Sequence, residues 1–441
     1  MRIAYITAGA AGMYCGSCMR DNTLVAALAK AGHDALLVPT YTPIRTDEAD
    51  VSQPRVFLGG INVYLEQKFW LFRHTPRLFD RLFNSRRLLR WVSRFAANAN
   101  YSELGQLTIS MLRGKDGKQR KEVDELSNWL ATDVKPDVVV LTNALLSGII
   151  PDVRRVGGAP VVVTLQGDDI FLDALPGADR RACIDLIRAN CESAAGFIST
   201  SRYYAEYMAG YLGLPRERID VVYPGISLVG HGRVAATGVR PPTIGYFARI
   251  CPEKGFHHAV DAFLHLRRTP GAPRAKLRVS GWLGDNNRAY FNAQVKKLGA
   301  AGVTADFEYT DCPTHADKVR FLQSIDVLTV PTTYREPKGL YVLEAWANGV
   351  PVVQPRHGAF PELIEATGGG LLVEPNDPAA LAGGLRQLLD DPALRERCGR
   401  AGELAVRERF TAGAMASETV AVLGRYTNHA APSSSPTARD S

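Results

Sequence analysis

The sequence of 441 residues lacks the features that mark several large classes of protein. No apolar run approaches the roughly 20 residues that a membrane-spanning helix needs, so the sequence predicts no integral membrane protein. The first strand begins beside the N-terminus, and we therefore expect no signal peptide before it. Seven cysteines, an odd number, without features of export predict a reducing, cytoplasmic environment.

Close pairs of cysteines are also scarce. Cys15 and Cys18 are two residues apart, whereas the other five cysteines form no second close pair. A structural zinc ion usually needs two such pairs, so we exclude zinc. A Cys-x-x-Cys pair at the start of a helix has a lowered thiol pKa, which keeps a redox role for Cys15 and Cys18 as an alternative.

The cysteine pair belongs to a loop, "GAAGMYCGSC", that lacks a dinucleotide fingerprint. Gly9 and Gly12 do not form a G-x-G step, and the next strand ends "VPT" without an acid for a ribose. The loop follows a strand at residues 3–6 and precedes a helix that ends at Gly32, which indicates a βαβ unit. Open parallel sheets bind ligands at the carboxyl ends of their strands, so this loop is expected to face one.

A recognisable nucleic-acid-binding fold is missing too, although the net charge is +7. Residues 68–95 contain eight basic residues and one acid, so the net charge of this segment equals the net charge of the whole chain. This segment predicts two short amphipathic helices with four arginines on one face of the second. A helix packed on its own domain is the ordinary interpretation. The alternative is peripheral contact of residues 76–95 with an anionic membrane, and no nucleic-acid partner is expected.

Strand-like and helical segments alternate in two consecutive sets, from "AYIT" to "IDVVYPG" and from "TIGYFARI" to "GLLVEP". This pattern predicts an α/β fold with two doubly wound Rossmann-like domains that face a central cleft, where a ligand would bind. The predicted parts are an N-terminal domain (1–228), a linker (229–241), a C-terminal domain (242–405), a C-terminal helix (406–427) and a disordered tail (428–441).

The segment "REPKGLYVLEAWANGVPVV" carries the most specific signal for a site. Glu336 and Glu344 are separated by seven residues, and residues 340–347 predict a helix. The amides of Gly339 and Leu340 would then be free donors at a helix N-terminus, which suits a diphosphate. Glu344, one turn into the helix, can accept both hydroxyls of a ribose. Glu336, at the loop tip, would meet the group beyond the diphosphate.

The run from residue 336 to residue 353, followed by "GAFPELIEATGGGLLVEPNDPAAL", resembles the retaining glycosyltransferases of family 4, also called group 1 and similar to glycogen synthase. The stretches "LAKAGHDALLV", "PDVVVLTN", "FISTSRYYAEYM", "IDVVYPGIS" and "FARICPEKGF" match landmarks of that family in order. The resemblance covers nearly the whole chain. It implies the two-domain GT-B fold, with an acceptor-side N-terminal domain and a C-terminal domain that binds a nucleotide-sugar donor.

The resemblance also implies roles for two cations. Arg249 and Lys254, in "ARICPEKG", match the Arg and Lys that hold the donor diphosphate in such enzymes. A fixed cationic pair stabilises the charge that develops on a departing diphosphate. The sequence has no cluster of metal ligands, so the implied reaction is a hexosyl transfer with retention of configuration and without a metal or other cofactor.

Two positions depart from the family. Gly12 and Gly16 lie in the loop that faces the donor phosphate and the acceptor, but Cys15 stands where the family has a glycine. Gln166, in "TLQGDD", stands near the anomeric centre where many relatives have a histidine. Glutamine donates and accepts hydrogen bonds but cannot act as a base. The acids at 168–169 are expected to form a turn and cap a helix.

The leading hypothesis is a cytoplasmic glycosyltransferase, at most peripheral at the inner membrane face, that moves a sugar from a nucleotide diphosphate to the hydroxyl of an unknown acceptor. A sugar-nucleotide epimerase of similar fold is an alternative, because it needs no acceptor-facing domain. A non-catalytic module that binds sugar nucleotides or senses thiols is another, and Gln166, Cys15 and Cys18 favour it.

Overall fold

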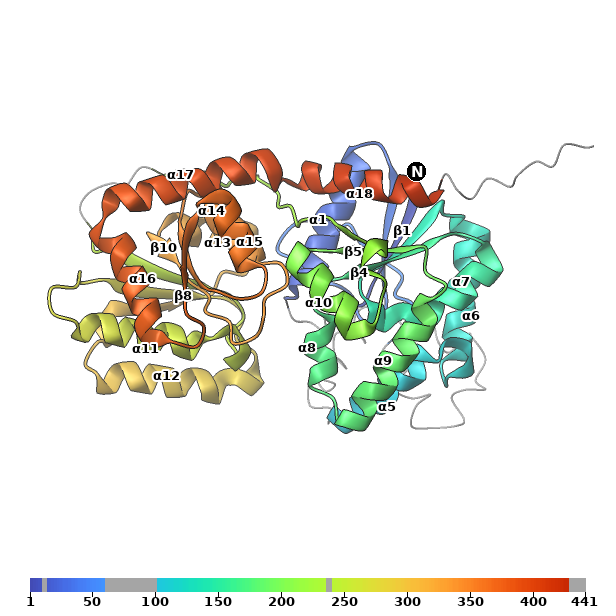
Figure 1. Cartoon of the computed structure of the whole chain (residues 1–441), viewed down its shortest axis with the longest axis horizontal. Helices are drawn as coiled ribbons and strands as arrows, with labels where there is room; N and C mark the ends of the chain where they lie inside the picture. The colour runs from blue at the N-terminus through green and yellow to red at the C-terminus, as the bar shows by residue number, and fades with distance from the viewer. Residues whose placement is uncertain (10–13, 60–100, 235–239, 428–441) are drawn as a thin grey trace, which may run out of the picture.

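The structure of the chain is a computed structural model that describes residues 1–9, 14–59, 101–234 and 240–427. These residues form two α/β units side by side, each built around one sheet (Figure 1). The predicted α/β class with two doubly wound sheets is therefore confirmed. Gly12, the basic segment 76–95 and the tail 428–441 lie outside the described residues.

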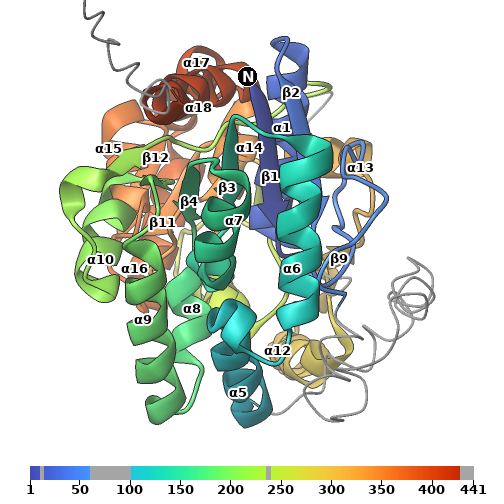
Figure 2. The same ribbon diagram turned by 90° about the vertical axis from the view of Figure 1, so that its right-hand side faces the viewer.

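The first unit is a six-stranded parallel sheet in the order β2-β1-β3-β4-β5-β6. Its strands are β1 (Arg2–Thr7), β2 (Asp34–Pro39), β3 (Val138–Leu141), β4 (Val161–Leu165), β5 (Gly196–Ser199) and β6 (Ile219–Val221). Its described helices are α1 (Gly16–Lys30), α5 (Tyr101–Leu112), α6 (Arg120–Trp129), α7 (Ile150–Gly157), α8 (Asp168–Asp173), α9 (Gly177–Cys191) and α10 (Arg202–Leu212). The strands β3 to β5 are buried throughout because helices cover both faces, and Figure 2 shows α6 and α7 in front of the sheet.

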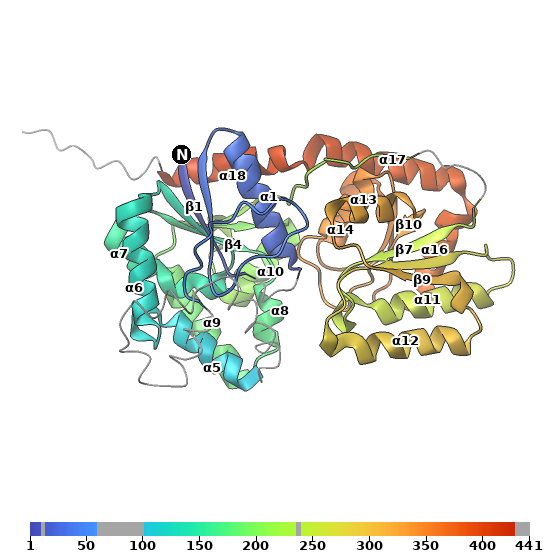
Figure 3. The ribbon, with the colours of Figure 1, turned by 180° about the vertical axis from the view of Figure 1, so that it is seen from behind.

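The second unit repeats this plan in the order β12-β11-β10-β7-β8-β9, again parallel. Its strands are β7 (Thr243–Phe247), β8 (Lys276–Ser280), β9 (Phe307–Thr310), β10 (Val327–Leu328), β11 (Val352–Pro355) and β12 (Gly370–Val373). Its helices are α11 (Phe256–Arg268), α12 (Arg288–Ala300), α13 (His315–Gln323), α14 (Leu340–Ala347), α15 (Phe360–Thr367), α16 (Pro378–Asp390) and α17 (Pro392–Arg409). In Figure 3, α11 and α12 lie below the sheet and α17 runs along the top.

The order of winding reverses once in each sheet. From β1 the chain adds β2 on one side and β3 on the other, and from β7 it adds β8 on one side and β10 on the other. Open α/β sheets bind ligands outside the carboxyl ends of the strands at this point of reversal. The loops after β1, β7 and β10 lie there, and they carry Gly16, Arg249, Lys254, Glu336 and Gly339 of the predicted site, whereas Gln166 follows β4 and Glu344 lies within α14.

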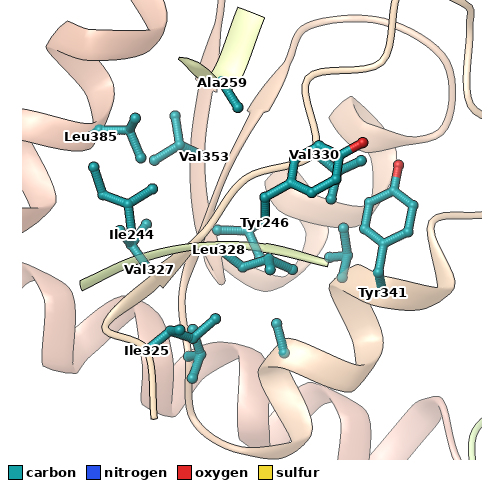
Figure 4. Close-up of a cluster of buried hydrophobic side chains, with 14 of the residues drawn as sticks. Ile244, Tyr246, Ala259, Ile325, Val327, Leu328, Val330, Tyr341, Val353 and Leu385 are labelled. Carbon is teal, nitrogen blue, oxygen red and sulfur yellow. The ribbon is translucent and has the colours of Figure 1, made fainter. Parts of the chain in front are cut away.

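An apolar cluster fills the second unit beneath these loops. Figure 4 shows Ile244, Val327 and Leu328 in this cluster, with the tyrosines Tyr246 and Tyr341 beside them. Complete burial of one such aliphatic side chain contributes about 1.5–3 kcal/mol to folding. The hydroxyls of the two tyrosines point toward the same edge of the cluster, where the site begins.

Two chain segments connect the units, and they are hydrogen-bonded to each other. The Ile226 amide donates to the Phe410 carbonyl at 2.9 Å, and the Ala412 amide donates to the Ile226 carbonyl at 2.9 Å. A Cβ atom on Gly225 would lie 2.1 Å from the Thr411 carbonyl oxygen, so only glycine fits there. We call residues 225–226 together with 410–412 the two-strand hinge.

After the hinge, α18 (Ala412–Thr427) returns to the first unit and packs against α1 (Figure 1). Met415 and Leu423 of α18 are buried in the cluster that covers one face of the first sheet. The helix predicted at 406–427 is thus found as α18, while residues 406–409 form the last turn of α17. The predicted domain boundaries stay predictions.

The length and charge of a helix decide whether it can cross a membrane. The helix α17 has 18 residues, but its sequence, "PALRERCGRAGELAVRER", is rich in charged side chains. Among the described residues, no helix combines the length and the apolar character that a bilayer crossing requires.

Candidate active site

A buried carboxylate lies in the loop between β10 and α14. Glu336 is 3% exposed, and its Oε2 accepts a hydrogen bond from Lys254 Nζ at 2.7 Å. The hydroxyls of Tyr334 and Tyr341 donate to the same oxygen at 2.6 and 3.1 Å. Burial raises the pKa of Glu336, but the charge and hydrogen bond of Lys254 outweigh burial and lower this pKa to about 2. The structure brings the predicted residues Glu336 and Lys254 together as an ion pair.

Hydrogen bonds and a tight glycine turn fix the segment that carries Arg249 and Lys254. The Tyr246 hydroxyl, at the edge of the apolar cluster, can donate to the backbone carbonyls of Arg249 and Lys254, both at 3.2 Å. Gly255 follows with a φ of 71°, and a Cβ atom there would lie 1.7 Å from the Pro331 carbonyl oxygen. The sequence "ICPEKG" therefore folds into a tight turn that presents both cations at the end of β7.

Arg249 is the more accessible of these cations. Its side chain is 36% exposed, and the nearest carboxylate, Glu253, lies 4.0 Å away. An exposed pair at this distance contributes little to stability. The charge of Arg249 reaches the neighbourhood of Cys15 in the other unit, which places the guanidinium toward the cleft. A guanidinium in this position can form paired hydrogen bonds with a phosphate.

The N-terminus of α14 lies beside the ion pair. The helix begins at Leu340, as predicted, and Gly339 adopts a φ of 63° before it. The Gly339 amide, predicted to be free, donates to Glu336 Oε1 at 3.4 Å, which is long for a hydrogen bond. The first turn of α14 contains no acid, so Glu336, from the preceding loop, is the carboxylate that lies at the positive end of this helix.

Glu344 also lies where the sequence places it, but it has a partner. It is 7% exposed, and Lys318 Nζ donates to its Oε1 at 2.7 Å. Lys318 also pairs with Asp47 of the first unit at 2.5 Å. The cavity among these residues is about 20 Å³, enough for one water molecule and too small for a ribose. The predicted ribose contact therefore requires this cross-unit contact to rearrange.

Replacement of Glu344 by alanine is expected to weaken nucleoside diphosphate binding at least tenfold, while turnover at saturation changes less. The reason is that a lost hydrogen bond to a charged group typically costs about 1.5–3 kcal/mol. Titration calorimetry with UDP, GDP and ADP measures the effect. Glu308→Ala, an exposed glutamate on β9, is the matched control. Equal affinities of wild type and Glu344→Ala would contradict the ribose assignment.

Gln166 is held in a buried polar network of the first unit. It is 3% exposed, and its Nε2 donates to the Thr142 carbonyl at 2.9 Å and to Asp21 Oδ1 at 3.2 Å. The Tyr5 hydroxyl donates to the same Asp21 oxygen at 2.9 Å. Lys338 Nζ donates to Gln166 Oε1 at 3.3 Å. These contacts fix the side chain as a hydrogen-bonding group at the end of β4.

Asp168 and Asp169 open α8 directly after this position. Asp168 accepts hydrogen bonds from the amides of Ala144 at 2.6 Å and Gln166 at 3.0 Å, and burial raises its pKa to about 6. Asp169 accepts a hydrogen bond from the Tyr204 hydroxyl at 2.6 Å. Asp168 thus holds the turn between β4 and α8, and Asp169 ties α8 to α10. The predicted cap is wrong, because Gly167 is the N-cap residue of α8 and no side chain caps this helix.

The loop before α14 is fastened to the first unit. The Pro337 carbonyl accepts hydrogen bonds from the hydroxyls of Thr200 at 3.1 Å and Ser201 at 2.8 Å. The Glu362 carboxylate of α15 accepts hydrogen bonds from the first two backbone amides of α10, at 2.9 and 2.7 Å. The two units therefore meet directly on the loop that carries Glu336.

Cys15 and Gly16 of the first unit lie beside this loop. A Cβ atom on Gly16 would meet Leu340 Cδ1 and Lys338 Cε at 3.6 Å. Both Cys15 and Cys18 are free thiols, and Cys15 is half-buried. A hydrogen bond with Cys18 lowers the pKa of Cys15, which the charge of Lys338 lowers further. The same hydrogen bond raises the pKa of Cys18. The loop after β1 thus faces the second unit, as the sequence predicts.

Two family models match the chain in succession. The model described as "Glycosyl transferase 4-like domain" matches residues 22–225, and "Glycosyl transferases group 1" matches residues 234–405. The chain belongs to the group 1 glycosyltransferases. The resemblance seen in the sequence is therefore confirmed, with one model on each of the two units.

Curated relatives of this group 1 glycosyltransferase match part of its length. It is 32% identical to the glycogen synthase of Mycobacterium tuberculosis over 41% of this chain and 42% of the relative. It is 30% identical to the 2-deoxystreptamine glucosyltransferase of Streptomyces kanamyceticus over 57% of this chain and 66% of the relative. The chain spans about half the length of the curated relatives it matches.

Solved structures show the GT-B fold. HepE from Anabaena in complex with UDP superposes with a TM-score of 0.66 at 16% identity, over 96% of this chain and all of HepE. Sucrose-phosphate synthase from Thermosynechococcus elongatus gives a TM-score of 0.71 at 18% identity, over 97% of this chain and all of that chain. The expected GT-B architecture is therefore confirmed for this glycosyltransferase.

Cys15 of this glycosyltransferase is expected to react with iodoacetamide before the other cysteines at neutral pH. Its pKa is lowered, whereas burial raises the pKa of Cys183 to about 11 and that of Cys191 to about 12. Peptide mass spectrometry after brief labelling identifies the modified residue. Cys15→Ser should remove the fast reaction. Equal labelling of all seven cysteines would contradict the lowered pKa.

Sequence reasoning missed several buried charges behind the site. Lys318 shares the buried face of α13 with Phe321 and Leu322. A charged residue on the apolar face of a helix was therefore the signal in the sequence that could have indicated this buried charge. Asp21 on α1 is fully buried between apolar positions and gave a similar signal. Asp47 follows β2 in a loop, and nothing in its local sequence indicates a contact with the second unit.

Proposed function

We propose that this protein transfers a hexose from a nucleoside diphosphate sugar to an acceptor hydroxyl, with retention of anomeric configuration and without a metal ion. One observation carries the proposal: the Lys254–Glu336 ion pair, with Arg249 nearby, lies beyond the ends of β7 and β10 and beside the N-terminus of α14. The fold predicts a ligand at this place. HepE, which shares the fold, holds UDP and UDP-glucose in its crystal structures and supports this choice of donor.

In this proposal the cations stabilise the leaving group. Arg249 and the amides at the start of α14 bind the diphosphate and stabilise the negative charge that grows when the anomeric C–O bond breaks. Glu336 holds Lys254 in place and offers its carboxylate to a sugar hydroxyl. These groups are held by Tyr246 and Tyr341, so little reorganisation accompanies the reaction.

Gln166 lies on the acceptor side of the cleft. Its amide is held by Asp21 and Thr142 and has no group that takes up a proton near neutral pH. In a retaining transfer driven by departure of the diphosphate, the acceptor attacks from the face that the diphosphate leaves. The acceptor proton then passes to a phosphate oxygen. This path requires no base at position 166.

The acceptor lies toward the first unit in this proposal. The peripheral contact of residues 76–95 with an anionic membrane, and the cytoplasmic location, stay predictions.

Donor hydrolysis tests the function. We expect slow release of nucleoside diphosphate from one member of a panel of UDP-, GDP- and ADP-sugars, and faster release with an acceptor. Activity should be unchanged by EDTA, because Arg249 and Lys254 supply the positive charge. Loss of activity in EDTA with recovery on addition of Mg²⁺ or Mn²⁺ would overturn the metal-free part. Binding without turnover would favour the non-catalytic module, and interconversion of the donor sugar would favour the epimerase.

A further inference from the structure

The pair of Cys15 and Cys18 has no part in the proposed transfer. Cys15 is the N-cap residue of α1, and Cys18 lies in the first turn of this helix. The Met19 amide donates to the Cys15 carbonyl at 3.0 Å, so the helical hydrogen bonds begin at Cys15. Residues three apart in a helix have Cα atoms about 5 Å apart, which is within the range of about 4.4–6.8 Å that a disulfide spans. The backbone therefore places the two cysteines where their sulfurs can bond.

The two thiols interact but differ in their readiness to react. Cys15 is half-buried, whereas Cys18 is 2% exposed. The hydrogen bond with Cys18 is the largest cause of the lowered pKa of Cys15, and the charge of Lys338 lowers this pKa further, although burial raises it. The same hydrogen bond raises the pKa of Cys18. Since the thiolate is the reactive form, Cys15 is the thiol that attacks and Cys18 is held beside it.

The other five cysteines lack this arrangement. Cys183, Cys191, Cys251 and Cys398 are buried, and Cys312 is half-buried. Burial raises the pKa of all five thiols. A mild oxidant should therefore react at the pair on α1 before it reacts elsewhere in the chain.

The residues between the two cysteines contact the loop that carries Glu336. Lys338 Nζ donates to Ser17 Oγ at 2.7 Å, and a Cβ atom on Gly16 would lie 3.6 Å from Lys338 Cε. Burial lowers the pKa of Lys338, and the negative charge that Cys15 can carry opposes this shift. Because Lys338 is two residues from Glu336, a chemical change at Cys15 acts on a neighbour of the candidate active site.

We propose that Cys15 and Cys18 form a reversible disulfide that slows sugar transfer, with a small-molecule disulfide of the glutathione type as the oxidant. The Cys15 thiolate attacks one sulfur of the oxidant, so a mixed disulfide forms and one glutathione thiolate leaves. This step removes the charge on Cys15 that raises the pKa of Cys18. Cys18 then gives its proton to water and attacks the Cys15 sulfur, and the second glutathione thiolate leaves. The two protein thiols are oxidised, and one oxidised glutathione is reduced to two thiols.

Oxidation slows transfer in this proposal because it changes the contact between Cys15 and the loop of Glu336. The disulfide removes the negative charge that Cys15 can place near Lys338, and it ties the Cys15 side chain to α1. We expect kcat to fall about tenfold in the oxidised form, the usual effect of one lost contact with a charged group. This effect rests on the proposed function, whereas formation of the disulfide does not.

The test treats the full chain with oxidised glutathione and then with dithiothreitol. Both cysteines lie in one tryptic peptide, residues 3–20, so mass spectrometry shows their state directly. In wild type this peptide should lose two hydrogen atoms and carry no glutathione. Cys18→Ser should keep glutathione on Cys15, because the second thiol is missing, and Cys15→Ser should stay reduced. Cys312→Ser, which changes the other half-buried cysteine, should behave as wild type. A wild-type peptide that stays reduced, or that keeps glutathione, would overturn the disulfide.

Transfer rates of the same samples test the effect on activity. Oxidised wild type should transfer about tenfold more slowly than reduced wild type, and dithiothreitol should restore the rate. Oxidised glutathione should not change the rate of Cys15→Ser relative to the untreated variant. Equal rates of oxidised and reduced wild type would overturn the regulatory role. Absence of transfer by reduced wild type would overturn the proposed function instead, and the peptide masses would still decide whether the disulfide forms.

Discussion

Replacement of Glu336 by alanine is expected to lower kcat by about 10²–10³-fold. The carboxylate is buried and accepts hydrogen bonds from Lys254, Tyr334 and Tyr341, so its loss leaves the part-buried Lys254 ammonium without a carboxylate. Removal of one member of a buried ion pair typically costs about 3–5 kcal/mol. Single-turnover assays with saturating donor measure the chemical step directly. KM for the donor should change much less than kcat.

The control for this result is Glu365→Ala, which removes an exposed glutamate of α15 that pairs with Arg356. A kcat within twofold of wild type for Glu336→Ala would refute the assignment.

The pH dependence of folding stability supplies a second readout for Glu336. The pKa of Glu336 falls from 4.5 to about 2 on folding, so its ion pair adds stability above pH 4.5 that is lost as the pH approaches 2. The stability difference between wild type and Glu336→Gln should therefore shrink between pH 5 and pH 3.

Replacement of Arg249 by alanine should also lower kcat by about 10²–10³-fold, but without loss of stability. The side chain is 36% exposed and its one carboxylate contact is long, so the folded state depends little on it. The guanidinium is nevertheless placed to neutralise the departing diphosphate. Equal melting temperatures with a large difference in kcat are the expected result.

Arg249→Lys provides the matched comparison, because it keeps the charge and loses the planar fork of donors. We expect it to recover part of the rate. Arg356→Ala, on the surface of the same unit, controls for the change in net charge. A melting temperature that falls together with kcat would show that Arg249 supports the fold, and the leaving-group role would then be wrong.

Local sequence patterns predicted the strands and the site loops well. The helix expected at residues 340–347 is α14, and "TIGYF" is the buried strand β7. The prediction of these elements is correct because the periodicity of apolar residues and the positions of turn glycines are properties of the local sequence. The motif with Glu344 indicated Glu336, and the resemblance to the family indicated Lys254. The structure explains why they meet, because they follow β10 and β7, which lie side by side at the reversal of winding.

Contacts between the units could not be predicted in this way. Lys318 forms an ion pair with Asp47, and Lys338 donates a hydrogen bond to Ser17, only because the two units pack against each other. The residues of each pair are separated by hundreds of positions in the chain, and neither has a local pattern that names its partner. A contact within the second unit, that of Glu344 with Lys318, was equally hidden. The spacing of Glu344 from Glu336 is visible in the sequence, whereas its contact with Lys318 depends on the packing of α13.

The two-strand hinge determines how the protein can open. A single connecting segment would let one unit rotate about the other in any direction. Two segments joined by backbone hydrogen bonds restrict the rotation to one axis. Bending about that axis remains easy, and twisting would break the bonds at Ile226. The contact of the Pro337 carbonyl with two hydroxyls of the first unit therefore depends on the same relative position of the units that the hinge favours. The close approach of Gly225 to Thr411 thus helps to set the position of a site that lies elsewhere in the molecule.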